Sequence, residues 1–241
     1  RTAGMTASGS RPITLALDCA GSACSVVLAV GDTIICGERS ERRYGQAEAL
    51  MPMVEAVMSN AGFVPAELTL VATSVGPGSF TGIRVGLAAA RGIALATGAQ
   101  LVGVTSFEAV AGRLGWPVGA APRFLLIALE SRREDIYVQF FSHRGEPLGQ
   151  PVAVMPGALR EAVDRMIGAA PLAIAGDAAP RAVLALADRA GCSRLEGSAP
   201  DAPGVLRAGL RHWRSERFVE ARPLYLRPPD VTVADRKVRS N

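Results

Sequence analysis

A glycine-rich loop in the first half of the chain has the residue types needed to hold a phosphate group. It contains three glycines and two hydroxyl residues: Gly76, Gly78, Ser79, Thr81 and Gly82. Glycine lets the backbone approach a ligand closely, and amides at a helix N-terminus attract anions. The loop matches neither a P-loop nor a dinucleotide fingerprint, so a tight turn that begins a helix is the alternative interpretation.

A carboxylate closes the first predicted strand. Asp18 follows the mostly apolar residues 13–17 and precedes a hairpin of small residues. Many phosphoryl-transfer enzymes hold a metal-bound phosphate with an acid in this position, although an aspartate at a strand end often only caps a turn. We take Asp18, together with the glycine loop, as a candidate cofactor site, and we assign no catalytic residue.

The composition excludes several classes of protein. Of the 241 residues, 49% are hydrophobic and 20% charged, which is typical of a globular chain, and no apolar run reaches the roughly 18 residues of a membrane span. The two histidines, His143 and His212, have no ligand partner at zinc-site spacing. The four cysteines form no C-x-x-C pair, so we expect buried, reduced thiols, with a disulfide or metal role as the alternative. We expect a cytoplasmic protein and no metal.

Hydrophobic periodicity predicts two α/β lobes. The first has strands at 13–18, 23–30, 34–36 and 68–74 and helices at 46–61 and 83–96. The order partly repeats, with strands at 123–128, 135–142 and 172–175 and helices at 158–167, 180–190 and 204–214. We predict an N-terminal extension over 1–12, a first lobe over 13–113, a second lobe over 114–221 and a C-terminal tail over 222–241.

The two predicted helices of the first lobe are candidates for a protein-binding surface. Helix 83–96 has a nearly bare face of glycine and alanine that would let another helix approach closely, and helix 46–61 is rich in methionine, which suits adaptable surfaces. Packing within the core explains the same pattern. The candidate interface residues are Leu50, Met51, Val54, Met58, Arg84, Gly86, Ala90 and Arg91.

Several segments resemble the TsaB (YeaZ) family. Residues 15–26 are similar to the first hairpin of that family, residues 75–86 to its glycine signature, and residues 223–227 to its C-terminal P-x-Y-L-R element. A weaker family segment matches residues 134–138, and the resemblance extends over about residues 13 to 230. It implies an α/β fold with duplicated ribonuclease-H-like lobes of the actin/hexokinase/Hsp70 (ASKHA) type.

The resemblance also implies a function. TsaB-like proteins help to transfer threonylcarbamoyl from threonylcarbamoyl-AMP to N6 of adenosine 37 in tRNAs that read codons beginning with A. They are regarded as non-catalytic partners of the catalytic subunit TsaD, act with the ATPase TsaE, and pair with TsaD or with a second copy of themselves through the two helices named above. The resemblance implies contact with tRNA through the complex, and ATP or ADP at the complex interface rather than held firmly by this chain.

Two other functions stay open on the sequence. A small-molecule kinase or ATPase of the same fold would use Asp18 and the glycine loop as phosphate contacts. A glycoprotease-like peptidase would need a serine, histidine and acid arrangement that no segment suggests. The role of Glu130 is also open, because relatives often carry aspartate there. Whether the arginine-rich C-terminal segment touches tRNA is not decided by the sequence.

Overall fold

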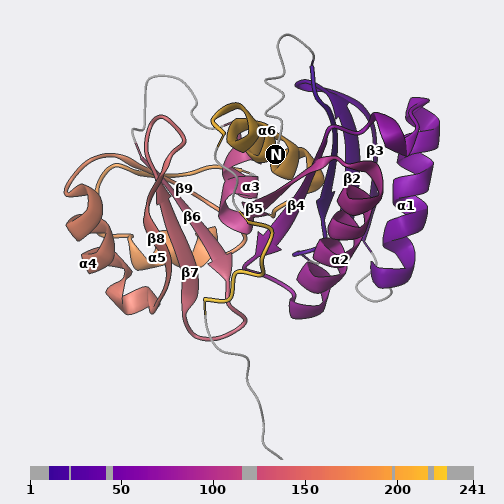
Figure 1. The fold of residues 1–241 in the computed structure, drawn as a ribbon. Helices are drawn as coiled ribbons and strands as arrows, with labels where there is room; N and C mark the ends of the chain where they lie inside the picture. Colours follow the sequence, from indigo (N-terminus) through magenta and orange to yellow (C-terminus); the bar gives the residue numbers. More distant parts are fainter. Residues whose placement is uncertain are drawn as a thin grey trace, which may run out of the picture.

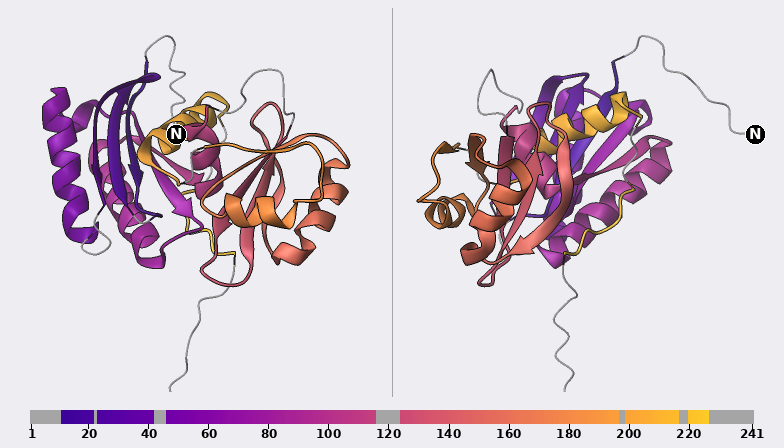
Figure 2. Two further views of the ribbon diagram at one scale, coloured as in Figure 1. Left: turned by 180° about the vertical axis from the view of Figure 1, so that it is seen from behind. Right: turned by 90° about the vertical axis from the view of Figure 1, so that its left-hand side faces the viewer.

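The two lobes repeat one strand order. The computed structural model describes residues 11–21, 23–41, 46–115, 124–196, 199–216 and 220–226. Within them, strands form two five-stranded sheets ordered β3-β2-β1-β4-β5 and β10-β9-β6-β7-β8 (Figures 1 and 2). Counted along the chain, the first three strands of each sheet (β1–β3 and β6–β8) pair antiparallel. The fourth and fifth strands (β4 and β5, β9 and β10) run parallel to the first strand of their sheet. This arrangement confirms the predicted duplicated α/β fold.

The strands follow the apolar runs of the sequence. The first sheet contains β1 (Ile13–Asp18), β2 (Cys24–Val30), β3 (Thr33–Ser40), β4 (Leu70–Gly76) and β5 (Gln100–Thr105). The second sheet contains β6 (Phe124–Glu130), β7 (Ile136–Phe141), β8 (Pro147–Val154), β9 (Leu172–Ala175) and β10 (Cys192–Arg194). The central strands β1, β4, β6 and β9 are almost wholly buried, as expected for strands covered on both faces.

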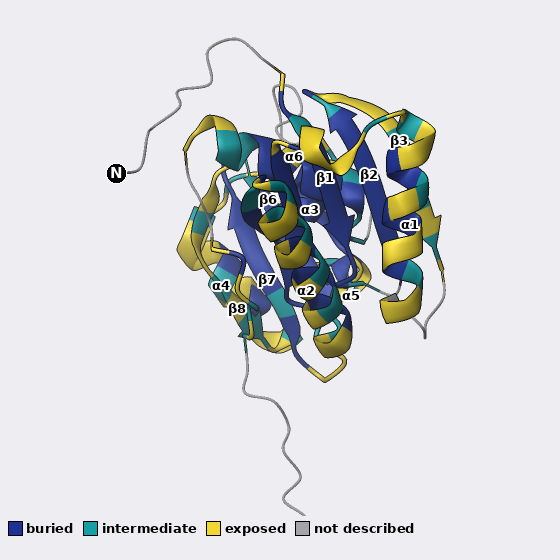
Figure 3. Ribbon diagram, turned by 45° about the vertical axis from the view of Figure 1, so that its right-hand side comes forward, coloured by how far each residue is buried: buried dark blue, intermediate teal, exposed yellow. Residues whose placement is uncertain are grey.

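Helices cover both faces of the first sheet. Alternate residues of β1 point to opposite faces: Leu15 and Leu17 pack beneath α1 (Gln46–Ala61) and α2 (Phe80–Thr97), whereas Ala16 packs beneath α6 (Ala202–Arg214). Figure 3 shows the buried strands between these helices, and the exposed outer faces of α1 and α2. A short 3-10 helix (Pro65–Glu67) follows α1.

The position of α6 differs from the sequence prediction. The predicted second lobe, 114–221, includes residues 202–214, but these residues pack on β1, β2, β4 and β5 of the first sheet and along α3 (Ser106–Arg113). A hydrogen bond from the Ala202 amide to the Ser25 hydroxyl, 2.9 Å long, fixes the start of α6 against β2. The remaining domain boundaries stay predictions. Residues 1–10 and 227–241, which include most of the predicted extension and tail, lie outside the described residues.

The second sheet is covered by α4 (Pro156–Ile167) and α5 (Ala179–Ala185) on one face and by α3 on the other. Phe107 and Val110 of α3 are buried against Leu125 and Ile127 of β6, so α3 lies between the two sheets. Among the described residues, no helix is both long enough and apolar enough to cross a lipid bilayer.

Candidate functional site

The glycine loop joins β4 to α2 and is closed by the turn between β1 and β2, which meets it at Ala20. The Ser79 amide donates a 2.7 Å hydrogen bond to the Ala20 carbonyl, and a Cβ atom on Gly78 would lie 2.2 Å from the same oxygen. Gly78 therefore permits a close backbone approach that any side chain would prevent. The hairpin thus takes the place next to the loop amides where a phosphate was expected.

The first turn of α2 uses the other end of the loop as its N-cap. The Ser79 hydroxyl accepts a 3.2 Å hydrogen bond from the Gly82 amide, and the Ser79 carbonyl accepts one from Ile83. Thr81 is exposed beside them. Since the amides of Ser79, Gly82 and Ile83 are all bonded within the chain, these contacts favour the helix-entry interpretation. Phosphate binding at this loop stays a prediction.

Asp18 lies beneath the same hairpin and is 1% exposed. Its Oδ1 accepts a 3.3 Å hydrogen bond from the Ala20 amide, and burial raises the pKa of the carboxyl from 3.8 to about 6. The structure therefore places Asp18, as a buried acid, beneath the hairpin whose Ala20 meets the glycine loop, and its role as a cofactor contact stays a prediction. Among the described residues, no group of three or more histidine, cysteine, aspartate or glutamate side chains is arranged to hold a metal ion.

Glu130 ends β6 as Asp18 ends β1, but it is paired with a cation. Arg181 of α5 contacts the Glu130 carboxylate at 2.7 Å and also bonds to the Glu134 carbonyl. The Glu130 amide donates to Asp177 Oδ1 at 2.8 Å. Glu130 therefore helps to hold the loop between β6 and β7, which is a structural role that the sequence did not reveal.

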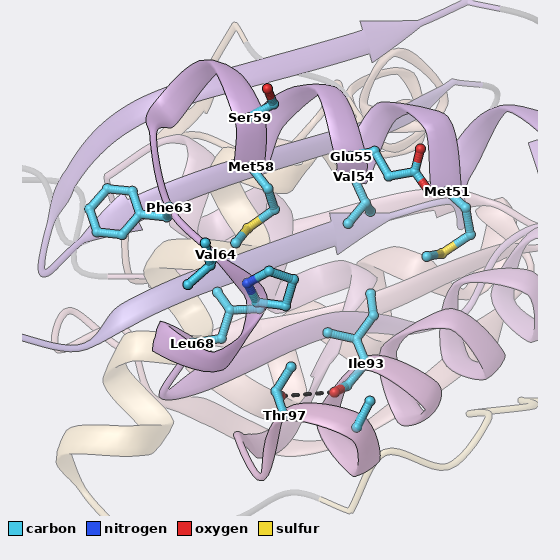
Figure 4. A pocket seen from close by; sticks show the side chains of 12 residues that line it. Met51, Val54, Glu55, Met58, Ser59, Phe63, Val64, Leu68, Ile93 and Thr97 are labelled. Carbon is cyan, nitrogen blue, oxygen red and sulfur yellow. Dashed lines mark hydrogen bonds between the residues drawn. The ribbon is translucent and has the colours of Figure 1, made fainter.

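An apolar groove lies between α1 and α2 on the outer face of the first lobe (Figure 4). We call it the α1–α2 groove; it has a volume of about 420 Å³. Its floor is formed by the buried side chains of Val54, Met58 and Leu68, and its rim by the exposed Met51 and Val64. The remaining lining residues are Glu55, Ser59, Phe63, Pro65, Ile93, Ala96 and Thr97.

Three of the predicted interface residues, Met51, Val54 and Met58, line the groove. The prediction was wrong for three others, which pack inside the lobe. Leu50 and Ala90 are 1% and 0% exposed and belong to the core. A Cβ on Gly86 would face Thr73 and Cys19 of the sheet, 3.5 Å from the Thr73 hydroxyl. The bare face of α2 therefore packs on its own sheet, and these three residues do not form a surface for a partner.

The two arginines of the predicted interface hold a C-terminal segment, residues 220–226. Arg91 donates a 2.6 Å hydrogen bond to the Ala221 carbonyl. The Arg84 guanidinium lies 3.4 Å from the centre of the Phe80 ring and 5.9 Å from that of Tyr225. The segment also bonds to β4, with the Leu224 amide donating to the Val75 carbonyl at 2.7 Å. The resemblance of residues 223–227 to a P-x-Y-L-R element pointed to this segment but not to its location against β4 and α2.

The arginines of α6 are likewise used within the chain. Arg207 donates to the carbonyls of Gly112 and Arg113, and Arg214 pairs with Asp32 at 2.6 Å. Burial lowers the pKa of Arg211. Contact between this helix and tRNA stays a prediction that these pairings do not favour. Arg222 of the C-terminal stretch pairs with Glu220 at 2.5 Å, and the other arginines of this stretch, 217 and those from 227 on, lie outside the described residues.

Comparison with known proteins places the chain among tRNA-modification proteins. A family model described as tRNA N6-adenosine threonylcarbamoyltransferase (TsaD) matches residues 42–181. The chain is 31% identical over 201 residues to an uncharacterized protein of Mycobacterium tuberculosis, covering 83% of this chain and 84% of that protein. It is 33% identical over 124 residues, covering 51% of this chain and 52% of the relative, to the tRNA threonylcarbamoyladenosine biosynthesis protein TsaB of Escherichia coli.

Solved structures show the same architecture. A Pseudomonas aeruginosa protein described as similar to the peptidase YeaZ superposes with a TM-score of 0.74 at 25% identity, covering 90% of this chain and 100% of that chain. A polyphosphate/ATP-glucomannokinase from Arthrobacter has a TM-score of 0.51 at 11% identity, covering 85% of this chain and 99% of that chain. This second likeness shows a fold shared with sugar kinases and nothing more.

Proposed function

The chain belongs to the TsaB (YeaZ) family, and we propose on this basis that it acts in the biosynthesis of threonylcarbamoyladenosine in tRNA as a non-catalytic partner subunit. Its partner is the catalytic subunit TsaD, with TsaE as a further component and tRNA contacted through the complex. The modified atom is N6 of adenosine 37, and the donor is threonylcarbamoyl-AMP. ATP or ADP belongs at the joint with TsaD.

The α1–α2 groove is the observation that carries this proposal. Its floor is apolar, and its rim exposes the apolar side chains of Met51 and Val64, by 41% and 58%, beside the polar Glu55 and Ser59. Burying apolar surface of this kind against a partner is favourable by roughly 25 cal/mol per Å². An amphipathic helix placed along α1 and α2 would cover these side chains, which is a common mode of recognition. A second copy of the chain would fit the same surface, giving a homodimer when TsaD is absent.

The region around Asp18 supports a non-catalytic role. A phosphoryl-transfer site needs an ionised acid and loop amides that face the substrate. Here the Asp18 side chain is buried beneath the hairpin, where it does not reach a substrate, and the Ser79 amide is bonded to Ala20. The kinase or ATPase alternative would require the hairpin to move away from the loop. Titration of the isolated chain with Mg-ATP by calorimetry tests it, because micromolar binding would favour the alternative.

Reconstitution tests the proposed function directly. Purified chain would be incubated with tRNA and threonylcarbamoyl-AMP, with and without TsaD and TsaE, and the modified nucleoside measured by mass spectrometry. We expect no product with the chain alone, and restored product when the chain joins TsaD and TsaE. Modification of tRNA by the chain alone, or equal activity of TsaD and TsaE without it, would contradict the proposal.

A matched pair of methionine variants tests the partner surface. Met51→Glu places a charge on the rim of the groove, and we expect binding to TsaD at least about tenfold weaker because the carboxylate would be desolvated in an apolar interface. Met166→Glu is the control, since Met166 is 46% exposed on α4 of the other lobe and should bind TsaD normally. Binding would be measured by calorimetry after both variants are shown to be folded. Equal affinities would remove the groove from the interface.

A further inference from the structure

Two cysteines face each other at the end of the β1–β2 hairpin. Asp18 pairs with Ser25 in the strand register, which places Cys19 opposite Cys24 at the next position. Their sulfur atoms are 2.8 Å apart, and each residue is 1% exposed. Both are free thiols. The proposed function uses neither of them.

The backbone already has the geometry of a disulfide. Residues directly opposite in an antiparallel pair have Cα atoms about 4.5 or 5.5 Å apart, depending on their hydrogen bonding. Disulfides form at Cα separations of about 4.4–6.8 Å. Both values lie inside this range, so a bond between the two sulfur atoms requires side-chain rotation without movement of the strands.

The surroundings of the pair favour a small oxidant. Cys19 lies under the bare face of α2, where a Cβ on Gly86 would be 3.9 Å from the Cys19 sulfur. Because Gly86 has no side chain, the backbone of α2 lies close over the Cys19 sulfur. This close cover leaves no room for a bulky disulfide reagent. Either thiol can donate to the other sulfur; the hydrogen bond between them lowers the pKa of Cys24, whereas the same interaction and burial raise the pKa of Cys19. Cys24 is therefore the better nucleophile of the two.

We propose that Cys19 and Cys24 are a redox-active dithiol that a small hydroperoxide converts to an intramolecular disulfide. The Cys24 sulfur attacks a peroxide oxygen, the O–O bond breaks, and an alcohol (or water, from hydrogen peroxide) leaves with a proton. The Cys19 sulfur then attacks the resulting sulfenic acid and expels its oxygen as water. Two thiols and one hydroperoxide thus give one disulfide, one alcohol and one water.

Mass spectrometry of the full chain tests the proposal without any variant. The folded protein would be treated with hydrogen peroxide, unfolded with an alkylating reagent, and cleaved before Asp18 and Asp32. The resulting fragment, residues 18–31, contains Cys19 and Cys24 but neither Cys36 nor Cys192. We expect this fragment to escape alkylation and to be lighter by about 2 Da than the reduced fragment, because two hydrogen atoms are lost. Dithiothreitol should restore both alkylation sites.

Variants then show which thiols are required. Cys19→Ser and Cys24→Ser should each abolish the lighter fragment, while the control Cys36→Ser, on the adjacent strand β3, should leave it unchanged. Full alkylation of residues 18–31 in the oxidised wild-type protein would overturn the proposal. So would a bond that joins Cys36 or Cys192 instead, and these results do not depend on whether the variants fold.

Discussion

The two lobes place an acid at the same point of the same topology and treat it differently. Asp18 ends β1, is buried, pairs with no cation within the part of the chain that the structure describes, and has its pKa raised to about 6. Glu130 ends β6, is partly exposed, and pairs with Arg181. The strand order therefore determines where the carboxyl group lies, while its burial and any neighbouring cation determine its pKa. A repeated fold does not imply a repeated chemical site.

The helical layers of the lobes differ in the same way. Helix α4 of the second lobe carries ion pairs on its surface, Arg160 with Asp164 and Glu161 with Arg165. The corresponding layer of the first lobe has the apolar α1–α2 groove, with the rim residue Met51 exposed. Among the described residues, the layer of the second lobe has a smaller hollow of about 260 Å³ whose lining includes Arg181, whereas the α1–α2 groove is larger and mostly apolar, so we place the partner contact in the groove.

The largest expected effect concerns the two glycines at the ends of the fourth strands, Gly76, which ends β4, and Gly176, which follows β9. Gly76 and Gly176 have φ values of +102° and +108°. A Cβ on Gly176 would lie 1.9 Å from the backbone oxygen of Ala128, whereas one on Gly76 first meets the flexible end of Ile83 at 2.7 Å. We expect Gly176→Ala to destabilise the chain by about 4 kcal/mol or more and Gly76→Ala by about 2 kcal/mol.

Urea unfolding of both glycine variants measures this difference. Gly98→Ala is the control: Gly98 also has positive φ, +74°, but has open space around its Cβ position, so only the backbone cost of about 1 kcal/mol applies. Equal losses for Gly76→Ala and Gly176→Ala would show that the two turns are not packed as differently as the structure indicates.

A smaller difference in unfolding free energy is expected between a core residue and a partner-surface residue of α1. Leu50 is 1% exposed and Met51 is 41% exposed, although they are adjacent and both apolar. Leu50→Ala should cost about 3 kcal/mol of unfolding free energy, because it leaves a cavity beneath the helix. Met51→Ala should change it by less than about 0.5 kcal/mol. Denaturant titrations of the two variants measure both changes in unfolding free energy. A large loss for Met51→Ala would show that Met51 belongs to the core and not to the partner surface.

The smallest effect concerns the two strand-end acids. Because burial raises the pKa of Asp18 from 3.8 to about 6, the folded chain binds this proton more tightly than the unfolded chain. Stability should therefore fall as pH rises from about 4 to about 6. Asp18→Asn removes this cost and should raise the unfolding free energy at pH 7 by about 2 kcal/mol.

Glu130→Gln is the comparison for that variant. It breaks the partly exposed ion pair with Arg181 and should lower the unfolding free energy by less than about 1 kcal/mol. Thermal unfolding between pH 4 and pH 7 measures both changes. A loss of stability on Asp18→Asn would show that the carboxylate form is needed in the fold.

Hydrophobic periodicity predicted the helices and strands with a strong apolar pattern and missed several of the others. The predicted helix 46–61 and strand 13–18 match α1 and β1. Strand β8 escaped prediction because two prolines and a glycine interrupt it, which an edge strand tolerates. The short helix α3 and strands β5 and β10 were also missed.

The candidate site shows where a one-dimensional pattern stops being informative. Leu50 and Met51 have similar side chains, and only the placement of the sheet decides which of them is covered. The glycines of α2 predicted a close approach correctly, but the approaching partner is the sheet of the same chain. The periodicity of a helix likewise identifies its apolar face but not the sheet on which that face packs. Helix α6 was predicted in the second lobe and packs on the first sheet.

The return of α6 to the first sheet has a consequence for biosynthesis. A ribosome that has released residues 13–113 has produced all five strands of that sheet, yet one face of it, around Ala16, still lacks its cover. The whole second lobe must be translated before that cover emerges. The second lobe is therefore free to fold first, and the domain that begins the chain is the last to be completed.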